Sequence, residues 1–102
     1  MPASRAIILD LETSGLSPNY GAKIIEIGMI KVENGKIIDK FQKLINPGFS
    51  ISHEITDYTG ITNKMLNGKP TWYKLRNPIL DFIEDYNIIA HNYSFDKRFL
   101  DH

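Results

Sequence analysis

Hydrophobic and polar positions along the first half of the chain follow the patterns of β-strands. An apolar run at residues 5–11 ends in Thr13-Ser14-Gly15, which predicts a buried strand followed by a turn. Two runs rich in β-branched residues, at 23–32 and 36–45, flank Asn34-Gly35, and Asn-Gly between such runs is a strong signal for a tight hairpin turn. The sequence therefore predicts three strands, of which the second and third form an antiparallel hairpin.

Helical patterns occupy the middle of the chain. Residues 52–58 and 62–66 are predicted to form short helices within a loop-rich crossover, because capping residues and turn signals flank them. Over residues 71–86 the apolar side chains recur mostly at helical spacing. A proline in a helix interior removes a hydrogen bond and clashes with the preceding turn. Pro78 therefore predicts a kink or a later start for this helix, which is expected to run to Asp85.

A short apolar segment and a final helical one complete the pattern. Residues 87–90 are predicted to be a buried strand, and a helix is expected from Ser94 onward. A right-handed helical crossover that joins two strands of one sheet places them parallel, so the fourth strand is expected to run parallel to the first. The sequence therefore predicts one α/β domain with a mixed sheet, in which three antiparallel strands are joined by a fourth that is parallel to the first.

Composition narrows the class of protein. With 42% hydrophobic and 24% charged residues, no apolar segment of membrane-spanning length and no signal-peptide pattern, the sequence is typical of a globular cytoplasmic protein. A formal net charge of zero argues against a sequence-independent binder of duplex DNA. The absence of cysteine excludes disulfides, thiolate zinc sites and a thiol nucleophile. Any metal must be held by oxygen or imidazole, which favours Mg²⁺ or Mn²⁺.

The charges are distributed unevenly despite this balance. Residues 61–80 carry basic side chains and no acidic one, whereas residues 81–102 are acidic on balance. The basic residues are Lys64, Lys69, Lys74 and Arg76. A modest basic face beside an acidic pocket suits a few nucleotides of single strand. A solvated helix surface explains the same pattern equally well.

Two acidic residues, Asp10 and Glu12, lie at the carboxyl end of the first predicted strand, where such sheets bind ligands. Side chains two residues apart on a strand project from the same face, about 7 Å apart along the chain. The two carboxylates can therefore converge on one hard cation, which gives a physical reason for two like charges to coexist. Alone the pair is weak evidence, because an Asp-x-Glu arises by chance in roughly a third of chains this long. The alternative is a strand end whose acids are simply exposed.

Three parts of the chain form a more specific pattern. The first is Asp10-Leu11-Glu12-Thr13-Ser14-Gly15, and the last runs from His91 to Leu100, with Asp96 expected in the first turn of a helix after a strand. Between them stand Thr59-Gly60-Ile61-Thr62 and Gly68-Lys69-Pro70. Together they resemble the first motif (Asp-x-Glu-Thr-x-Gly), the intervening features and the second motif of the DEDD superfamily of exonucleases. This superfamily includes the proofreading exonucleases of bacterial DNA polymerase III.

The resemblance implies a ribonuclease H-like fold and a metal-dependent 3′→5′ exonuclease. It implies that Asp10, Glu12 and Asp96 ligate two Mg²⁺ or Mn²⁺ ions, which activate a water and stabilise the leaving 3′ oxygen during phosphodiester hydrolysis. It also implies that further residues border the terminal nucleotide: Thr13, Thr59, Gly60, Ile61, His91 and Asn92. Plainer explanations exist for several of these. His91 could be a hydrogen-bonded residue at a strand end, Asn92 a turn or cap residue, and Thr59-Gly60 a turn that needs glycine.

The superfamily's third motif has no counterpart in these 102 residues. The resemblance implies a general-base His or Tyr and a fourth Asp on a later helix, together with a fifth strand and covering helices. Residues 1–102 are therefore interpreted as a single, incomplete exonuclease domain, truncated before the family's last strand and helices. The apolar surface left exposed is expected to favour self-association.

The leading hypothesis is the amino-terminal part of a proofreading-type exonuclease. It would hydrolyse single-stranded DNA from the 3′ end, release nucleoside monophosphates and work with a DNA polymerase or helicase, away from any membrane. The isolated chain is expected to be inactive or weakly active. Two alternatives stay open: an exoribonuclease of the same superfamily, and a non-catalytic remnant that binds nucleic acid or a partner protein.

Overall fold

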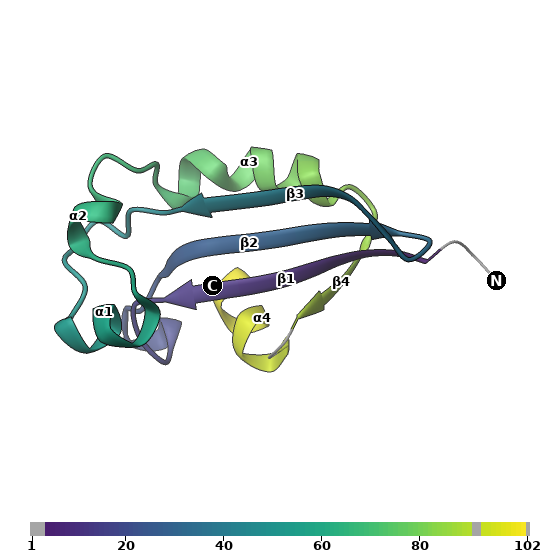
Figure 1. Ribbon diagram of the computed structural model, residues 1–102. Coiled ribbons are helices and arrows are strands. Elements are labelled where there is room, and N and C mark those ends of the chain that lie inside the picture. Colours follow the sequence, from purple (N-terminus) through teal and green to yellow (C-terminus); the bar gives the residue numbers. More distant parts are fainter. Residues whose placement is uncertain (1–3, 91–92, 102) are drawn as a thin grey trace.

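Four strands form one mixed sheet in the computed structural model, which describes residues 4–90 and 93–101 (Figure 1). The strands are β1 (Arg5–Thr13), β2 (Ile24–Glu33), β3 (Lys36–Leu44) and β4 (Asn87–Ala90), and their order across the sheet is β3-β2-β1-β4. Strand β2 pairs antiparallel with β1 and β3, whereas β4 runs parallel to β1. The predicted topology, three antiparallel strands and a parallel fourth, is confirmed.

The β2–β3 hairpin turns at Asn34 and Gly35, as the sequence predicts. Both residues have positive φ angles, of 52° and 80°. This is the backbone of a two-residue turn whose twist matches that of the flanking strands. Asparagine and glycine tolerate it better than other residues do. The turn places Glu33 opposite Lys36 and Val32 opposite Ile37, and the register then shifts between Val32 and Lys31.

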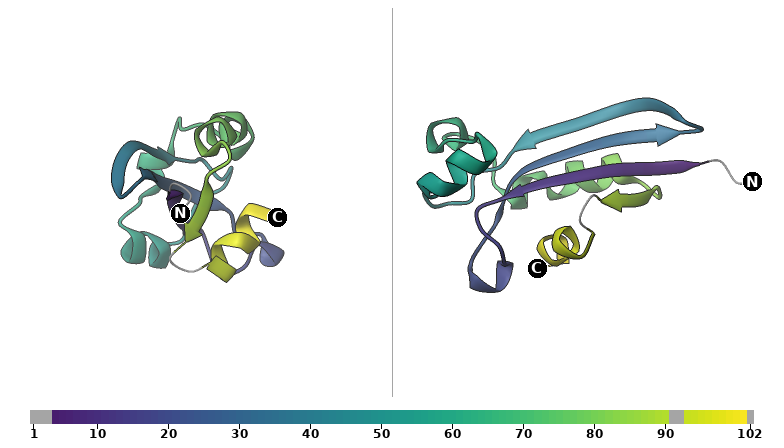
Figure 2. Two further views of the ribbon diagram at one scale, coloured as in Figure 1. Left: turned by 90° about the vertical axis from the view of Figure 1, so that its right-hand side faces the viewer. Right: turned by 60° about the horizontal axis from the view of Figure 1, so that its bottom comes forward.

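Helices lie on both sides of the sheet. A 3-10 helix, η1 (Pro18–Tyr20), lies in the β1–β2 loop, and the α-helices are α1 (His53–Thr59), α2 (Asn63–Leu66), α3 (Trp72–Ile83) and α4 (Tyr93–Asp101). Figure 2 shows α3 and α4 on one face of the sheet and α1 on the other. Within the described ranges, no helix is long and apolar enough to cross a membrane.

One face of β1 is buried beneath α3 and α4. Alternate residues of the strand are at most 6% exposed and belong to the main core: Ile7, Leu9 and Leu11. They share this core with Leu75 of α3 and Phe99 of α4. Because successive residues of a strand point to opposite sides of a sheet, Ile8, Asp10 and Glu12 lie on the other face. We call this second side, which α3 and α4 leave uncovered, the open face.

Helix α3 begins at Trp72 and contains Pro78, so the prediction of a later start is wrong. The helix ends at Ile83, close to the expected end at about Asp85. Pro78 is exposed, so water can bond to the carbonyl oxygen that loses its helical partner. Leu75 and Ile79 pack into the core on either side of it. Tertiary packing has therefore overridden the local preference.

A buried lysine holds the turn between α3 and β4. The Nζ atom of Lys31, a residue that is 7% exposed, lies 2.7 Å from a carboxylate oxygen of Glu84. The same ammonium lies 4.6 Å and 4.8 Å from the ring centroids of Phe82 and Tyr86, within the range of cation–π attraction. Glu84 has a φ of 52°, a left-handed backbone that costs a non-glycine residue about 1–2 kcal/mol. The bond to Lys31 offsets part of this strain.

Strand β4 is exposed, although its apolar sequence predicts a buried strand. Ile88 and Ile89 are 37% and 56% exposed. The strand lies at the edge of the sheet and pairs with β1 on one side only. The prediction of a buried strand is wrong for these residues, because hydrophobicity alone does not distinguish a central strand from an edge strand.

Candidate active site

Two carboxylates project from the open face near the carboxyl end of β1. Asp10 lies opposite Gly28 of β2, and Glu12 lies opposite Glu26. Residues that face each other in an antiparallel pair have side chains on the same side, with Cβ atoms about 5 Å apart. Gly28 leaves the space beside Asp10 without a side chain, whereas Glu26 adds a third carboxylate next to Glu12. The register shifts between Glu12 and Thr13, directly after the pair.

Glu12 lies where this negative charge is concentrated. Its pKa is raised above the ordinary value of 4.5, first by partial burial and then by the charges of Asp10, Glu26 and Asp96. Asp96 lies in the first turn of α4 and is 4% exposed. Because the charge of Asp96 acts on Glu12, the second sequence motif lies near the first in the folded chain. The three residues predicted as metal ligands therefore share one region of the structure.

We expect Glu12→Gln to stabilise the fold at neutral pH. The pKa of this carboxyl group is higher in the folded chain than in the unfolded chain. At a pH between these two pKa values, the folded chain binds more protons than the unfolded chain, so the free energy of unfolding falls as pH rises. The amide carries no charge. The melting temperature of the variant, minus that of the native chain, should therefore grow as pH rises above 4.5 and become constant beyond the raised pKa.

Thermal unfolding followed by circular dichroism in metal-free buffers measures this difference. Asp81→Asn is the control, because Asp81 is an exposed residue of α3 on the opposite side of the sheet from Glu12. Its melting temperature relative to the native chain should show no comparable dependence on pH. A difference for Glu12→Gln that stays flat from pH 4 to neutrality would contradict the raised pKa.

The carboxylate oxygens of Asp10, Glu12 and Asp96 are suitable ligands for a hard cation. Carboxylate oxygens are the ligands that Mg²⁺ and Mn²⁺ prefer. All of the influences that shift the pKa of Glu12 act against its charge, and a bound cation would relieve them. Among the described residues, however, no three acidic or histidine side chains lie close enough together to hold an ion. The described part of the chain thus supplies suitable donors without a completed ligand set.

The turn after the carboxylates is held by its own side chains. Thr13 is 8% exposed, and its hydroxyl donates a hydrogen bond of 2.7 Å to the carbonyl oxygen of Gly15. The backbone N–H of Ser14 donates to the carbonyl oxygen of Lys23 at 2.8 Å, and that of Lys23 donates to Oγ of Ser14 at 2.9 Å. The Thr13 hydroxyl therefore supports the turn, and its contact with a terminal nucleotide stays a prediction.

The segment Thr59-Gly60-Ile61 ends α1 and leads into α2. The Thr59 hydroxyl donates to a carbonyl oxygen one helical turn earlier, at 2.8 Å, and accepts from the N–H of Ile61 at 3.1 Å. Gly60 caps the helix with a φ of 79°, which glycine adopts without strain. Ile61 is 3% exposed and packs in a cluster with Ile25, the neighbour of Glu26. The segment thus packs against β2, and its contact with substrate stays a prediction.

Two predicted site residues, His91 and Asn92, and one residue that was not predicted, Glu26, complete the account of the site. His91 and Asn92 lie outside the described residues, so their places beside a nucleotide stay predictions. Glu26 is an acidic neighbour of the site that sequence patterns do not single out. An acid within the apolar run of β2 is a signal, but the register that places it opposite Glu12 becomes known only from the fold.

A mixed sheet of this order, with flanking helices, has the ribonuclease H-like fold. Residues 7–102 match the model of the Exonuclease (RNase_T) family, and the chain belongs to that family. The family is one of exonucleases, which are hydrolases. Members of this family generally use divalent metal ions.

Two curated relatives are bacterial replication proteins. The chain is 44% identical over 94 residues to the PolC-type DNA polymerase III of Thermotoga maritima, which covers 92% of this chain and 7% of that protein. It is 42% identical over 103 residues to the epsilon subunit of DNA polymerase III of Rickettsia typhi, which covers 100% of this chain and 45% of that protein. The chain thus spans less than half the length of either relative.

Two solved structures share the fold. Exonuclease X, in complex with 5′ overhanging duplex DNA, is 32% identical and superimposes with a TM-score of 0.73 over 91% of this chain and 52% of its own. The nuclease domain of 3′hExo, a DEDDh family member bound to rAMP, gives a TM-score of 0.82 over 98% of this chain and 57% of its own. At 20% identity, the second likeness shows the fold alone.

Proposed function

We propose that this chain carries part of the catalytic site of a metal-dependent 3′→5′ exonuclease that acts on single-stranded DNA. The observation that carries the proposal is that Asp10 and Glu12 project from one face of β1, with Asp96 near enough for its charge to raise the pKa of Glu12, in a chain that belongs to a family of exonucleases. In this proposal, residues 1–102 are an incomplete domain, because the family's general base and fourth acid have no counterpart among them.

The three carboxylates would hold the Mg²⁺ or Mn²⁺ ions through oxygen ligands. Bound ions supply Lewis acidity, which activates a water and stabilises the leaving 3′ oxygen. The chain supplies position: β1, the third strand across the sheet, fixes Asp10 and Glu12, and the first turn of α4 presents Asp96. The residues proposed to border the terminal nucleotide are Thr13, Thr59, Gly60, Ile61, His91 and Asn92.

DNA is the proposed substrate because the relatives at 42% and 44% identity are DNA polymerase III proteins. A nucleoside monophosphate would be the product, and a DNA polymerase or a helicase would be the partner, in the cytoplasm. Of the basic residues that the sequence groups together, Lys64, Lys69, Lys74 and Arg76, all are exposed. They are therefore available to single-stranded DNA, with Lys74 and Arg76 on α3, across the sheet from Asp10 and Glu12.

The isolated chain is expected to degrade DNA slowly or not at all. A positioned general base contributes roughly 10²–10⁴-fold to the rate, so the chain should be at least about 100-fold slower than a complete member of the family. A gel assay with a 3′-labelled single strand and Mn²⁺ measures the release of labelled nucleotide.

A matched RNA strand tests the exoribonuclease alternative, which faster cleavage of RNA than of DNA would favour. Robust, processive degradation of DNA that Asp10→Ala abolishes would refute the need for a third motif.

A further inference from the structure

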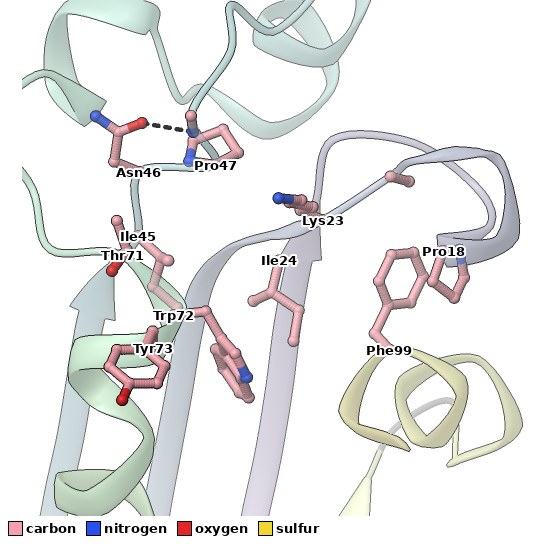
Figure 3. Close-up of a pocket in the computed structure, with 12 residues that line it drawn as sticks. Pro18, Lys23, Ile24, Ile45, Asn46, Pro47, Thr71, Trp72, Tyr73 and Phe99 are labelled. Atoms are coloured by element: carbon pink, nitrogen blue, oxygen red, sulfur yellow. Dashed lines mark hydrogen bonds between the residues drawn. The ribbon is translucent and has the colours of Figure 1, made fainter. Parts of the chain in front are cut away.

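A cavity of about 480 Å³ opens on the face of the sheet opposite Asp10 and Glu12. It lies between the first turn of α3, the end of β3 and α4 (Figure 3). Figure 3 shows Trp72 on one side, Phe99 beside Pro18 on the other, and Ile24 of β2 between them. Ile24 and Phe99 belong to the core beneath α3 and α4, whereas Asp10 projects from the open face. This cavity, the Trp72 cleft, therefore lies across the sheet from Asp10 and Glu12 and shares α4 with Asp96.

The charge at the Trp72 cleft is positive. Among the described residues, Lys23 is the only charged side chain that lines the cleft, and its ammonium forms no ion pair with any of them. The backbone of Lys23 is fixed by its hydrogen bonds to Ser14, which holds the start of the side chain in place. The exposed ammonium is thus available to an anion at the rim of an otherwise apolar cavity.

The first turn of α3 adds to this positive charge. Thr71, Trp72 and Tyr73 line the cleft, and they are the N-cap and the first two residues of a 12-residue helix. Thr71 makes no side-chain hydrogen bond to the helix, so the first amide groups are not capped. Uncapped amides at a helix N-terminus carry partial positive charge and favour an anion.

We propose that the Trp72 cleft docks a peptide segment of a partner protein that pairs an apolar side chain with an adjacent carboxylate. The apolar side chain lies between Trp72 and Phe99, above Ile24. The carboxylate lies at Lys23 and the N-terminus of α3. One lysine and one helix end match a single carboxylate, and the apolar walls provide the anchor that most peptide-binding grooves use.

A nucleic-acid strand fits this cavity less well. Binding to a strand neutralises several phosphates with several cations, and the cleft has one lysine. The lining therefore favours an acidic and apolar peptide over a nucleotide.

Trp72 is the only tryptophan of the chain, so its fluorescence reports directly on the cleft. The probe is a capped peptide, Gly-Ser-Leu-Phe-Asp-Gly, titrated into the full chain. We expect a saturable change in emission. Binding should weaken at least about tenfold when Leu-Phe is replaced by Ser-Ser, and again when Asp is replaced by Lys. Asp10→Asn should leave the titration unchanged, which separates this proposal from the proposed nuclease function.

Two variants and a control test the charge. Lys23→Glu should weaken binding of the Asp peptide at least about tenfold. Lys36→Glu, which changes an exposed lysine of β3 outside the cleft lining, should leave it nearly unchanged. Thr71→Asp supplies the missing N-cap of α3, so it should raise the melting temperature. The new carboxylate occupies the place of the peptide's carboxylate, so the variant should bind the peptide more weakly. Loss of binding in a stabilised variant cannot be attributed to unfolding.

Other outcomes would overturn the proposal. No saturable signal with the Leu-Phe-Asp peptide, or equal binding by the native chain and Lys23→Glu, would remove the cleft as a peptide site. Displacement of the peptide by oligothymidylate would assign the cleft to nucleic acid. A shift in emission that depends on protein concentration without peptide, together with dimers in sedimentation, would assign it to a second copy of the chain.

Discussion

Asp10→Asn is expected to reduce the Mn²⁺-stimulated release of nucleotides by this chain at least about 100-fold. A metal ion contributes several kcal/mol to stabilising the transition state, and each 1.36 kcal/mol is a factor of ten in rate. The amide is a poor ligand for a hard cation, yet it has nearly the volume of the carboxylate and lies at an exposed position of β1. The rate is measured under single-turnover conditions, with protein in excess over a 3′-labelled strand.

Asp81→Asn is the matched control for this experiment. Asp81 is exposed on α3, on the opposite side of the sheet from the carboxylates, and its loss should leave the rate unchanged. The control also identifies a contaminating nuclease, because a contaminant would give the same rate in both variants. An Asp10→Asn variant that keeps the native rate would remove Asp10 from the metal site.

Glu84→Ala is expected to lower the free energy of unfolding by about 1–3 kcal/mol. It removes the carboxylate and leaves the ammonium of Lys31 buried with only Phe82 and Tyr86 beside it. The estimate lies below that for a fully buried pair, because the side chain of Glu84 is 54% exposed. Urea denaturation measures the change, and the melting temperature should fall by roughly 4–8 °C for each kcal/mol.

Lys31→Met separates the charge from the packing. An apolar chain of similar volume fills the space between Phe82 and Tyr86 and needs no partner, so its cost should stay below about 1.5 kcal/mol. Asp81→Ala, an exposed change on α3, should stay within about 0.5 kcal/mol of the native chain. If Lys31→Met were as destabilising as Glu84→Ala, an unpaired buried ammonium would not explain the loss.

Much of the fold follows from local patterns. The hairpin is predictable because Asn34-Gly35 has few conformations available to it, and β1 is predictable because an apolar run ends in turn residues. Errors arise where distant packing decides. Pro78 lies inside α3 because the core holds the helix on both sides of it. The burial of β4 depends on which strands surround it, which its own sequence does not encode.

The candidate site was predictable in part. The spacing of Asp10 and Glu12 on a strand fixes their common face, and the motif around Asp96 indicates that it approaches them. The proximity of Glu26 depends on the register between β1 and β2, which no local turn signal specifies. The burial of Lys31 is equally hidden, because a lysine within a strand normally indicates a solvated position. Interactions between distant segments are what the sequence patterns leave out.

Titration calorimetry of Mn²⁺ tests the proposed metal site most directly. We expect the native chain to bind Mn²⁺ weakly and saturably, more tightly in the presence of a nucleoside monophosphate, and Asp10→Asn to lose this binding while staying folded. Absence of binding of either Mn²⁺ or the nucleotide by the folded native chain would contradict a metal-dependent nuclease site and would favour the non-catalytic remnant.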